Sequence, residues 1–182
     1  FEYAKKRSKK LCCVDKANVL ETSRLWRETV QGMEKDYPEI KVSYEFVDAV
    51  AMRLVQWPSS YDVLITSNLF GDILTDEASV ISGSMGLMPS ASIGSENALY
   101  EPIHGSYPEA TGKKIANPIA SILSLSMMLD HSFNLEDESK IINRAVEDSL
   151  VNKFTTPDLN KDNKAYTTDE VGDYIVNFIK NS

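Results

Sequence analysis

Short apolar runs alternate, in the first part of the chain, with segments whose apolar residues recur every three or four positions. The runs at Leu11–Val14, Val42–Val47 and Tyr61–Thr66 predict buried strands. A helical pattern follows each run: one segment carries Leu25, Trp26, Thr29, Val30 and Met33, and the other two span Asp48–Gln56 and Asn68–Ile81. Strands that alternate with helices predict an α/β fold whose sheet is built through crossover connections.

From Gly83 the composition shifts to Gly, Ser, Pro and Met, and a loop-like texture continues as far as Asn117. Asn117 and Pro118 predict the N-cap and the first position of a helix. We therefore place a domain boundary near residue 82, which divides the chain into residues 1–82 and 83–182. Two more amphipathic helices are predicted at Leu135–Val151 and Thr167–Ile179, and the turn-rich stretch between them holds Pro157, Asn160 and Asn163.

Composition narrows the class of protein. The 182 residues are 42% apolar and 25% charged, which suits one modest enzyme or a piece of a larger one. The net charge is −8, although five of the first ten residues are basic. So acidic a chain argues against a nucleic-acid surface. We interpret the basic run as a solvated helix end, with a localisation signal as the alternative.

Two adjacent cysteines, Cys12 and Cys13, lie in an apolar run where strand geometry points them to opposite faces. They cannot form a disulfide framework, and no signal peptide or long apolar span is present, so we expect a cytoplasmic protein that does not enter a membrane. The chain opens on Phe1, in what reads as the end of a helix, and we expect residues upstream of it.

Carboxylates supply the first candidate chemistry. Asp72 and Asp76 lie four residues apart on a predicted helix and so share a face. They are either two solvated side chains or ligands of one divalent cation, and oxygen-only ligation favours Mg²⁺ or Mn²⁺ over zinc. Asp48, just after a strand, is a possible third ligand or a helix N-cap.

A lysine and a loop form the second group of candidate functional residues. Lys16 follows a strand end, where α/β sheets commonly face a ligand, and it is either a proton donor and acceptor or a solvated lysine. The loop after residue 100 contains small residues that let the backbone approach a phosphate. No GxGxxG follows a strand, so a Rossmann fingerprint is absent. The loop's candidates are His104, Gly105, Ser106, Glu109 and Asn117.

Together the segments VDKANVL, NLFGDILTDEAS, GSMGLMPSASIG, LYEPIHGSYPEATGKKIANP and SILSLSMML resemble the C-terminal part of the β-decarboxylating dehydrogenases, the isocitrate/isopropylmalate dehydrogenase family. NLFGDIL and PSASIG resemble the isopropylmalate members more than the isocitrate members. The resemblance covers nearly the whole chain and implies the C-terminal half of a two-domain fold with a non-Rossmann cofactor site. Residues 1–82 would belong to the dimer-forming metal and substrate domain, and residues 83–182 to the cofactor-binding domain.

The resemblance also implies roles for residues. Lys16 matches the proton-transfer lysine, Asn18 the asparagine near the substrate and nicotinamide, and Asp48, Asp72 and Asp76 the metal carboxylates. Lys16, Asn18 and Asp48 would reach into the partner subunit's site, so each site of a homodimer would be shared. The cofactor loop would be formed by His104, Gly105, Ser106, Glu109 and Asn117. Glu109 stands where the family usually has Asp, and Thr155 where it usually has Arg, which leaves a cofactor role for Asp158 open.

The activity implied is oxidative decarboxylation of 3-isopropylmalate to 4-methyl-2-oxopentanoate with reduction of NAD, a step of leucine biosynthesis. Hydride would leave C2 of the 2-hydroxy acid, and the β-carboxylate would then leave as CO₂. The arginines for the substrate carboxylates would lie upstream, so we expect the 182-residue chain alone to be inactive. The alternatives are a sister enzyme for isocitrate, tartrate or homoisocitrate, and a noncatalytic dimerising or metal-binding fragment.

Overall fold

The computed structural model describes residues 1–160 and 164–182, so Asn163 of the turn-rich stretch lies outside the described residues. The chain divides into two compact units, Phe1–Ile81 and Ser82–Ser182, which are described separately below. This division falls next to the boundary expected near residue 82. The roles assigned to the two parts from the family resemblance stay predictions.

The first unit is built on a parallel sheet of three strands, in which β1 (Lys10–Asp15) lies between β2 (Lys41–Phe46) and β3 (Val63–Ile65). Helices α2 (Glu21–Met33) and α3 (Val47–Gln56) occur in the crossover connections between the strands. The predicted α/β fold is confirmed. Val47, expected at the end of a strand, instead begins α3. The preference of valine for strands is weak and depends on context, so it does not fix where a strand ends.

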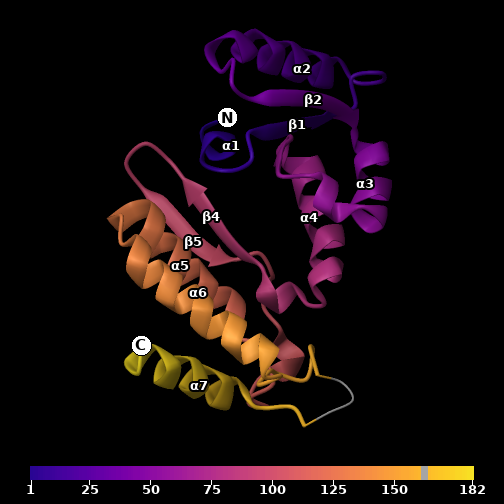
Figure 1. Cartoon of the computed structure of the whole chain (residues 1–182). Helices are drawn as coiled ribbons and strands as arrows, with labels where there is room; N and C mark the ends of the chain where they lie inside the picture. Colours follow the sequence, from indigo (N-terminus) through magenta and orange to yellow (C-terminus); the bar gives the residue numbers. More distant parts are fainter. Residues whose placement is uncertain (161–163) are drawn as a thin grey trace. The chain divides into compact units, whose positions relative to one another are not determined.

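Alternate residues of β1 face opposite sides of the sheet, and both sides are covered (Figure 1). On one side Cys12 and Val14 pack against side chains of α3 and of α4 (Asn68–Ser82). On the other, Leu11 packs with Ala4 of the short helix α1 (Glu2–Lys6) and with Ile40. Cys12 and Cys13 are free and buried, and burial raises the pKa of the Cys13 thiol to about 11, so both thiols stay protonated near neutral pH.

The second unit is layered (Figure 1). An antiparallel hairpin of β4 (Pro89–Ile93) and β5 (Ala98–Pro102) packs on α5 (Ile119–Phe133), which packs on α6 (Glu136–Val151), which in turn packs on α7 (Thr168–Lys180). This hairpin was not predicted from the sequence, because Gly, Ser and Pro in GSMGLMPSASIG are typical of a loop. The buried core of the unit lies among the helices and contains Ile119, Ala145, Val146, Val171 and Ile175.

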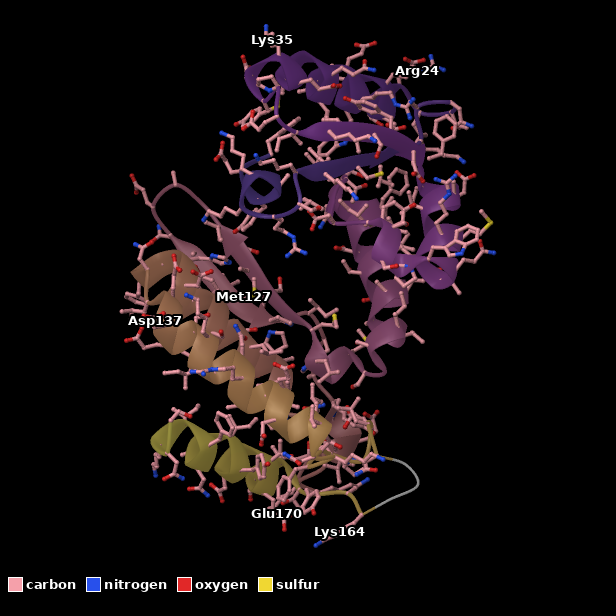
Figure 2. All side chains as sticks on the ribbon, in the orientation of Figure 1. Arg24, Lys35, Met127, Asp137, Lys164 and Glu170 are labelled. Carbon is pink, nitrogen blue, oxygen red and sulfur yellow. The ribbon has the colours of Figure 1, made fainter. Side chains whose placement is uncertain are left out.

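Side chains cap the starts of two helices in the second unit. The Ile119 amide donates to Asn117 Oδ1 at 3.0 Å, so the Asn117 side chain caps the start of α5 as predicted, although Pro118 occupies the N-cap position and the helix begins one residue later than expected, at Ile119. Thr167 caps α7 in a capping box with Glu170, whose side chain is labelled in Figure 2. Over residues 1–160 and 164–182, none of the helices combines the length and apolar character that a membrane span requires.

Candidate functional site

The ends of β1 and β2 bring Lys16 and Asp48 together. The two strands run in register with Asp15 opposite Phe46, so Lys16 leaves the sheet beside the start of α3. Lys16 Nζ donates a hydrogen bond to Asp48 Oδ1, and this bond lowers the pKa of the Asp48 carboxyl. Lys16 is partly buried, whereas Asp48 is exposed.

The structure also bears on the helix-cap interpretation of Asp48. Phe46 occupies the N-cap of α3 and Val47 begins the helix, so the N-cap interpretation of Asp48 is wrong. Lys16 lies at a strand end, partly buried and paired with a carboxylate. Asn18 is exposed in the turn that follows Lys16.

Asp72 and Asp76 lie one turn apart on α4, and both are exposed. Asn68 Nδ2 donates to Asp72 Oδ1 at 3.3 Å, which ties that carboxylate to the first turn of the helix. Within residues 1–160 and 164–182, no three His, Cys, Asp or Glu side chains gather closely enough to hold a metal ion. One chain therefore does not bring Asp48 together with Asp72 and Asp76.

The donor set fits a hard divalent cation only in part. Two carboxylates four residues apart on one helix face can supply two oxygen ligands to Mg²⁺ or Mn²⁺, ions that bind through oxygen and keep several waters. Among the described residues, one chain places no third His, Cys, Asp or Glu ligand beside these two carboxylates.

Helix α4 carries apolar side chains on two opposite sides. Leu74 is buried against β1 and α3, with Ala78 packed beside it. On the far side Leu69, Ile73 and Val80 are 66%, 57% and 76% exposed. At 3.6 residues per turn, Asp76 falls beside this exposed stripe. A helix that is apolar on both sides is normally buried on both sides, so the stripe calls for a covering surface next to the carboxylates.

The second unit holds a pocket of about 360 Å³. Four residues of the predicted cofactor loop line it: His104, Gly105, Ser106 and Asn117. Glu109 is exposed in the short 3₁₀ helix Pro108–Ala110 and is not among the lining residues. The remaining lining residues combine apolar walls with polar groups and are Ser84, Met85, Gly86, Tyr107, Ile115, Ala116 and Asp158.

Asp158 connects the pocket's walls. Its Oδ2 accepts hydrogen bonds from Ser84 Oγ and, at 3.0 Å, from Asn117 Nδ2, and its Oδ1 accepts one from Thr156 Oγ1 at 2.6 Å. All three partners are neutral donors, so the carboxylate acts as an anchor for the loop. The role of Asp158 was left open from the sequence because Thr155 stands where the family usually has Arg, and two of its partners, Ser84 and Asn117, lie far away in the chain.

Gly86, like Asp158, lines the pocket but was not among the cofactor-loop residues predicted from the sequence. A Cβ built on Gly86 would lie 2.6 Å from Asn117 Cβ, so only glycine allows the two segments to approach so closely. The signal was present in the glycine of GSMG, but its meaning depends on the position of Asn117. The pocket thus offers a partly apolar space with polar groups beside the start of α5.

Lys114, five residues after Glu109 in the chain, already has a carboxylate partner. Lys114 Nζ donates to Asp169 in the first turn of α7, and this bond raises the pKa of the Lys114 ammonium. Lys114 is therefore held by α7, and nothing in this arrangement directs its ammonium group to a phosphate.

Comparison with known proteins agrees with this geometry. Residues 1–175 match the family described as Isocitrate/isopropylmalate dehydrogenase. The chain belongs to this family. It is 58% identical over 160 residues to a 3-isopropylmalate dehydrogenase of Oceanobacillus iheyensis, covering 87% of the chain and 44% of the relative. It is 51% identical over 183 residues to that of Pseudomonas savastanoi, covering 100% of the chain and 51% of the relative.

Solved structures of the family share the fold. A crystal structure named isocitrate dehydrogenase, from Methylococcus capsulatus, superposes with a TM-score of 0.94 at 41% identity and covers 98% of this chain and 53% of its own. A β-decarboxylating dehydrogenase from Thermococcus kodakarensis gives a TM-score of 0.87 at 38% identity, covering 99% of this chain and 52% of its own. The chain spans about half the length of the curated relatives that it matches.

The Asp158 network predicts an acid-sensitive pocket. Burial raises the pKa of Asp158, but the hydrogen bonds from Ser84, Thr156 and Asn117 outweigh it, and the net pKa is lowered. The resulting stability is present above the unfolded pKa of ~3.9 and is lost as pH falls through the lower folded value. We expect Asp158→Asn to flatten the loss of stability below pH ~4, as measured by urea unfolding at several pH values.

Thr156→Val provides the second arm of this experiment, because it removes one donor and should move the acid-induced loss to higher pH. An Asp158→Asn protein with the same pH dependence as the wild type would show that the network does not stabilise the ionised carboxylate.

Proposed function

We propose that the chain is the C-terminal half of a subunit that oxidises and decarboxylates 3-isopropylmalate, with NAD as hydride acceptor, in leucine biosynthesis. The observation that carries the proposal is the pairing of Lys16 with Asp48 at adjacent strand ends, on a chain whose relatives are named 3-isopropylmalate dehydrogenase. The second candidate substrate is isocitrate, because one structure that superposes well on the chain bears that enzyme's name.

In the proposed site Lys16 moves the proton. Its side chain stands at a strand end, partly buried and oriented by Asp48. As a neutral amine it would accept a proton from a substrate hydroxyl and become an ammonium group, which would return a proton to carbon in the later step. Asn18, exposed two residues later, reaches the substrate and nicotinamide side. Asp72 and Asp76 would hold Mg²⁺ or Mn²⁺, and the bound ion would supply Lewis-acid polarisation of the substrate oxygens.

The second unit binds the cofactor in this proposal. His104, Gly105, Ser106 and Asn117 line the pocket, and Asp158 holds Asn117 and Ser84 in place. The apolar walls would take a ring of the cofactor and exclude water from it. Glu109, next to the pocket loop, would meet the adenosine ribose.

A homodimer completes the site. A single chain separates Asp48 from Asp72 and Asp76, and the exposed apolar stripe of α4 runs beside Asp76. If a second copy covers the stripe, its Lys16, Asn18 and Asp48 can approach the carboxylates of α4. The exposed Met52 and Val55 of α3 would extend the same interface.

The activity itself is tested in the full-length protein. We expect turnover of 3-isopropylmalate to exceed that of isocitrate, and Lys16→Met to lower kcat by about 10²-fold or more, because the variant keeps the side-chain length but cannot carry a proton. Lys35→Met, at an exposed lysine labelled in Figure 2, is the control and should keep wild-type turnover. A faster reaction with isocitrate would favour the second candidate, and normal turnover of Lys16→Met would remove Lys16 from the mechanism.

Shared sites predict complementation between two inactive variants. Lys16→Met and Asp72→Asn should each be inactive as homodimers. In a mixed dimer one site carries both defects and the other carries neither, so equal mixing with exchange of subunits should restore about one quarter of wild-type activity. Native mass spectrometry would confirm that mixed dimers form, and mixed dimers without activity would mean that each site is built by one chain.

The choice of cofactor should depend on Glu109. A carboxylate there accepts hydrogen bonds from the ribose hydroxyls of NAD and repels the 2′-phosphate of NADP. We expect the wild type to prefer NAD and Glu109→Lys to narrow or reverse the preference, measured as the ratio of kcat/KM for the two cofactors. Glu96→Lys, an exposed charge reversal in the hairpin turn, should leave the ratio unchanged. A wild type that prefers NADP would show that Glu109 does not face the ribose.

A further inference from the structure

A partly buried ion pair includes the residue directly before Lys16 in the chain, and the Arg27 side chain of this pair is 26% exposed. Asp15, the last residue of β1, is 1% exposed. Arg27 of α2 reaches it with two hydrogen bonds, from Nε to Oδ2 at 2.7 Å and from Nη2 to Oδ1 at 3.0 Å. This two-pronged contact fixes the orientation of both groups, which a single contact would not.

The same pair holds the turn that carries Lys16. Asp15 Oδ1 also accepts the amide hydrogen of Ala17 at 2.8 Å, and Arg24, one turn before Arg27 on α2, donates from Nε to the Ala17 carbonyl oxygen at 2.9 Å. Ala17 lies between Lys16 and Asn18, so its peptide groups are held on both sides. The amides of Val19 and Leu20 close the turn by donating to the Lys16 carbonyl oxygen at 3.0 and 2.9 Å.

Arg27 also touches the strand end that leads to Asp48. Its guanidinium carbon lies 5.1 Å from the centre of the Phe46 ring, and Phe46 is the cross-strand neighbour of Asp15 and the N-cap of α3. Lys16 Nζ lies 5.8 Å from the centre of the same ring. One side chain from α2 thus contacts both strand ends that bring Lys16 to Asp48.

We infer that Arg27 and Asp15 are positioning residues, which fix the Lys16–Asn18 turn and through it the place of the Lys16 ammonium group. The inference rests on the proposed function for its kinetic consequence, but not for its structural one. Stability alone is a poor explanation of the pair, because a buried ion pair is often no better for stability than apolar residues of the same volume. Its contacts with the Ala17 amide and the Phe46 ring instead hold the turn after β1 and the end of β2 in place.

Two variants test the inference in the full-length protein. Arg27→Lys keeps the positive charge and loses the two-pronged contact. The double variant Asp15→Asn with Arg27→Met removes both charges, so no buried charge is left unpaired, while the carboxamide oxygen introduced at position 15 can still accept from the Ala17 amide. Arg53→Lys is the matched control, because Arg53 also pairs with a carboxylate of this unit, Glu45, and has no contact with the turn.

The first readout is amide exchange of the peptide Asp15–Leu20 by mass spectrometry, which needs no activity. We expect exchange about tenfold faster or more in both variants and unchanged exchange in Arg53→Lys. The second is steady-state kinetics, in which kcat should fall by about 10- to 100-fold with KM changed by less than about threefold, and Arg27→Lys should retain more activity than the double variant. Urea unfolding confirms that the variants compared are folded.

Unchanged exchange of the Asp15–Leu20 peptide in both variants would overturn the inference, as would faster exchange with wild-type kcat. If the wild-type protein turns over no 2-hydroxy acid, the proposed function fails, and the exchange measurement still decides whether the pair fixes the turn. If one variant does not fold, the other carries the same two readouts.

Discussion

The parallel pairing of β1 with β2 is the constraint on which the first unit's chemistry depends. In a parallel sheet the carboxyl ends of neighbouring strands emerge at the same edge, and here the register sets Asp15 opposite Phe46. Lys16 follows the last residue of β1, and Asp48 lies two positions beyond the last residue of β2. The two side chains are then close enough to form a hydrogen bond. A slip of one residue would turn each side chain of β2 to the opposite face of the sheet and separate them.

In both units a wholly or partly buried carboxylate holds a loop in place by accepting several hydrogen bonds. Asp15 holds the turn after β1 through Arg27 and the Ala17 amide, and Asp158 holds Ser84, Thr156 and Asn117 around the pocket of the second unit. In each case several donors compensate the carboxylate for its loss of water, and the cost of breaking any one contact makes the arrangement rigid. Loops that carry functional groups are thereby fixed by the scaffold beneath them.

The two sides of helix α4 have different roles. Its inner side packs in the core of the first unit through Leu74, while its outer side carries an apolar stripe beside Asp76. A second copy of the chain that covers this apolar stripe would also bring polar side chains close to the carboxylates of α4. That is the physical basis for the proposal that two copies of the chain build each site.

The sequence by itself determined the features that depend on local periodicity and local chemistry. The alternation of strands and helices, the long helices and the Asn117 cap follow from side-chain spacing and capping, and the family follows from several motifs in order. The β4–β5 hairpin was missed, because Gly, Ser and Pro suggest loops until a partner strand and α5 cover them. Only the tertiary structure decided which distant residues meet. The Lys16–Asp48 bond, the Arg27–Asp15 contact, the links from Asp158 and the close approach of Gly86 to Asn117 all join segments by packing, and no local spacing in the chain encodes such contacts.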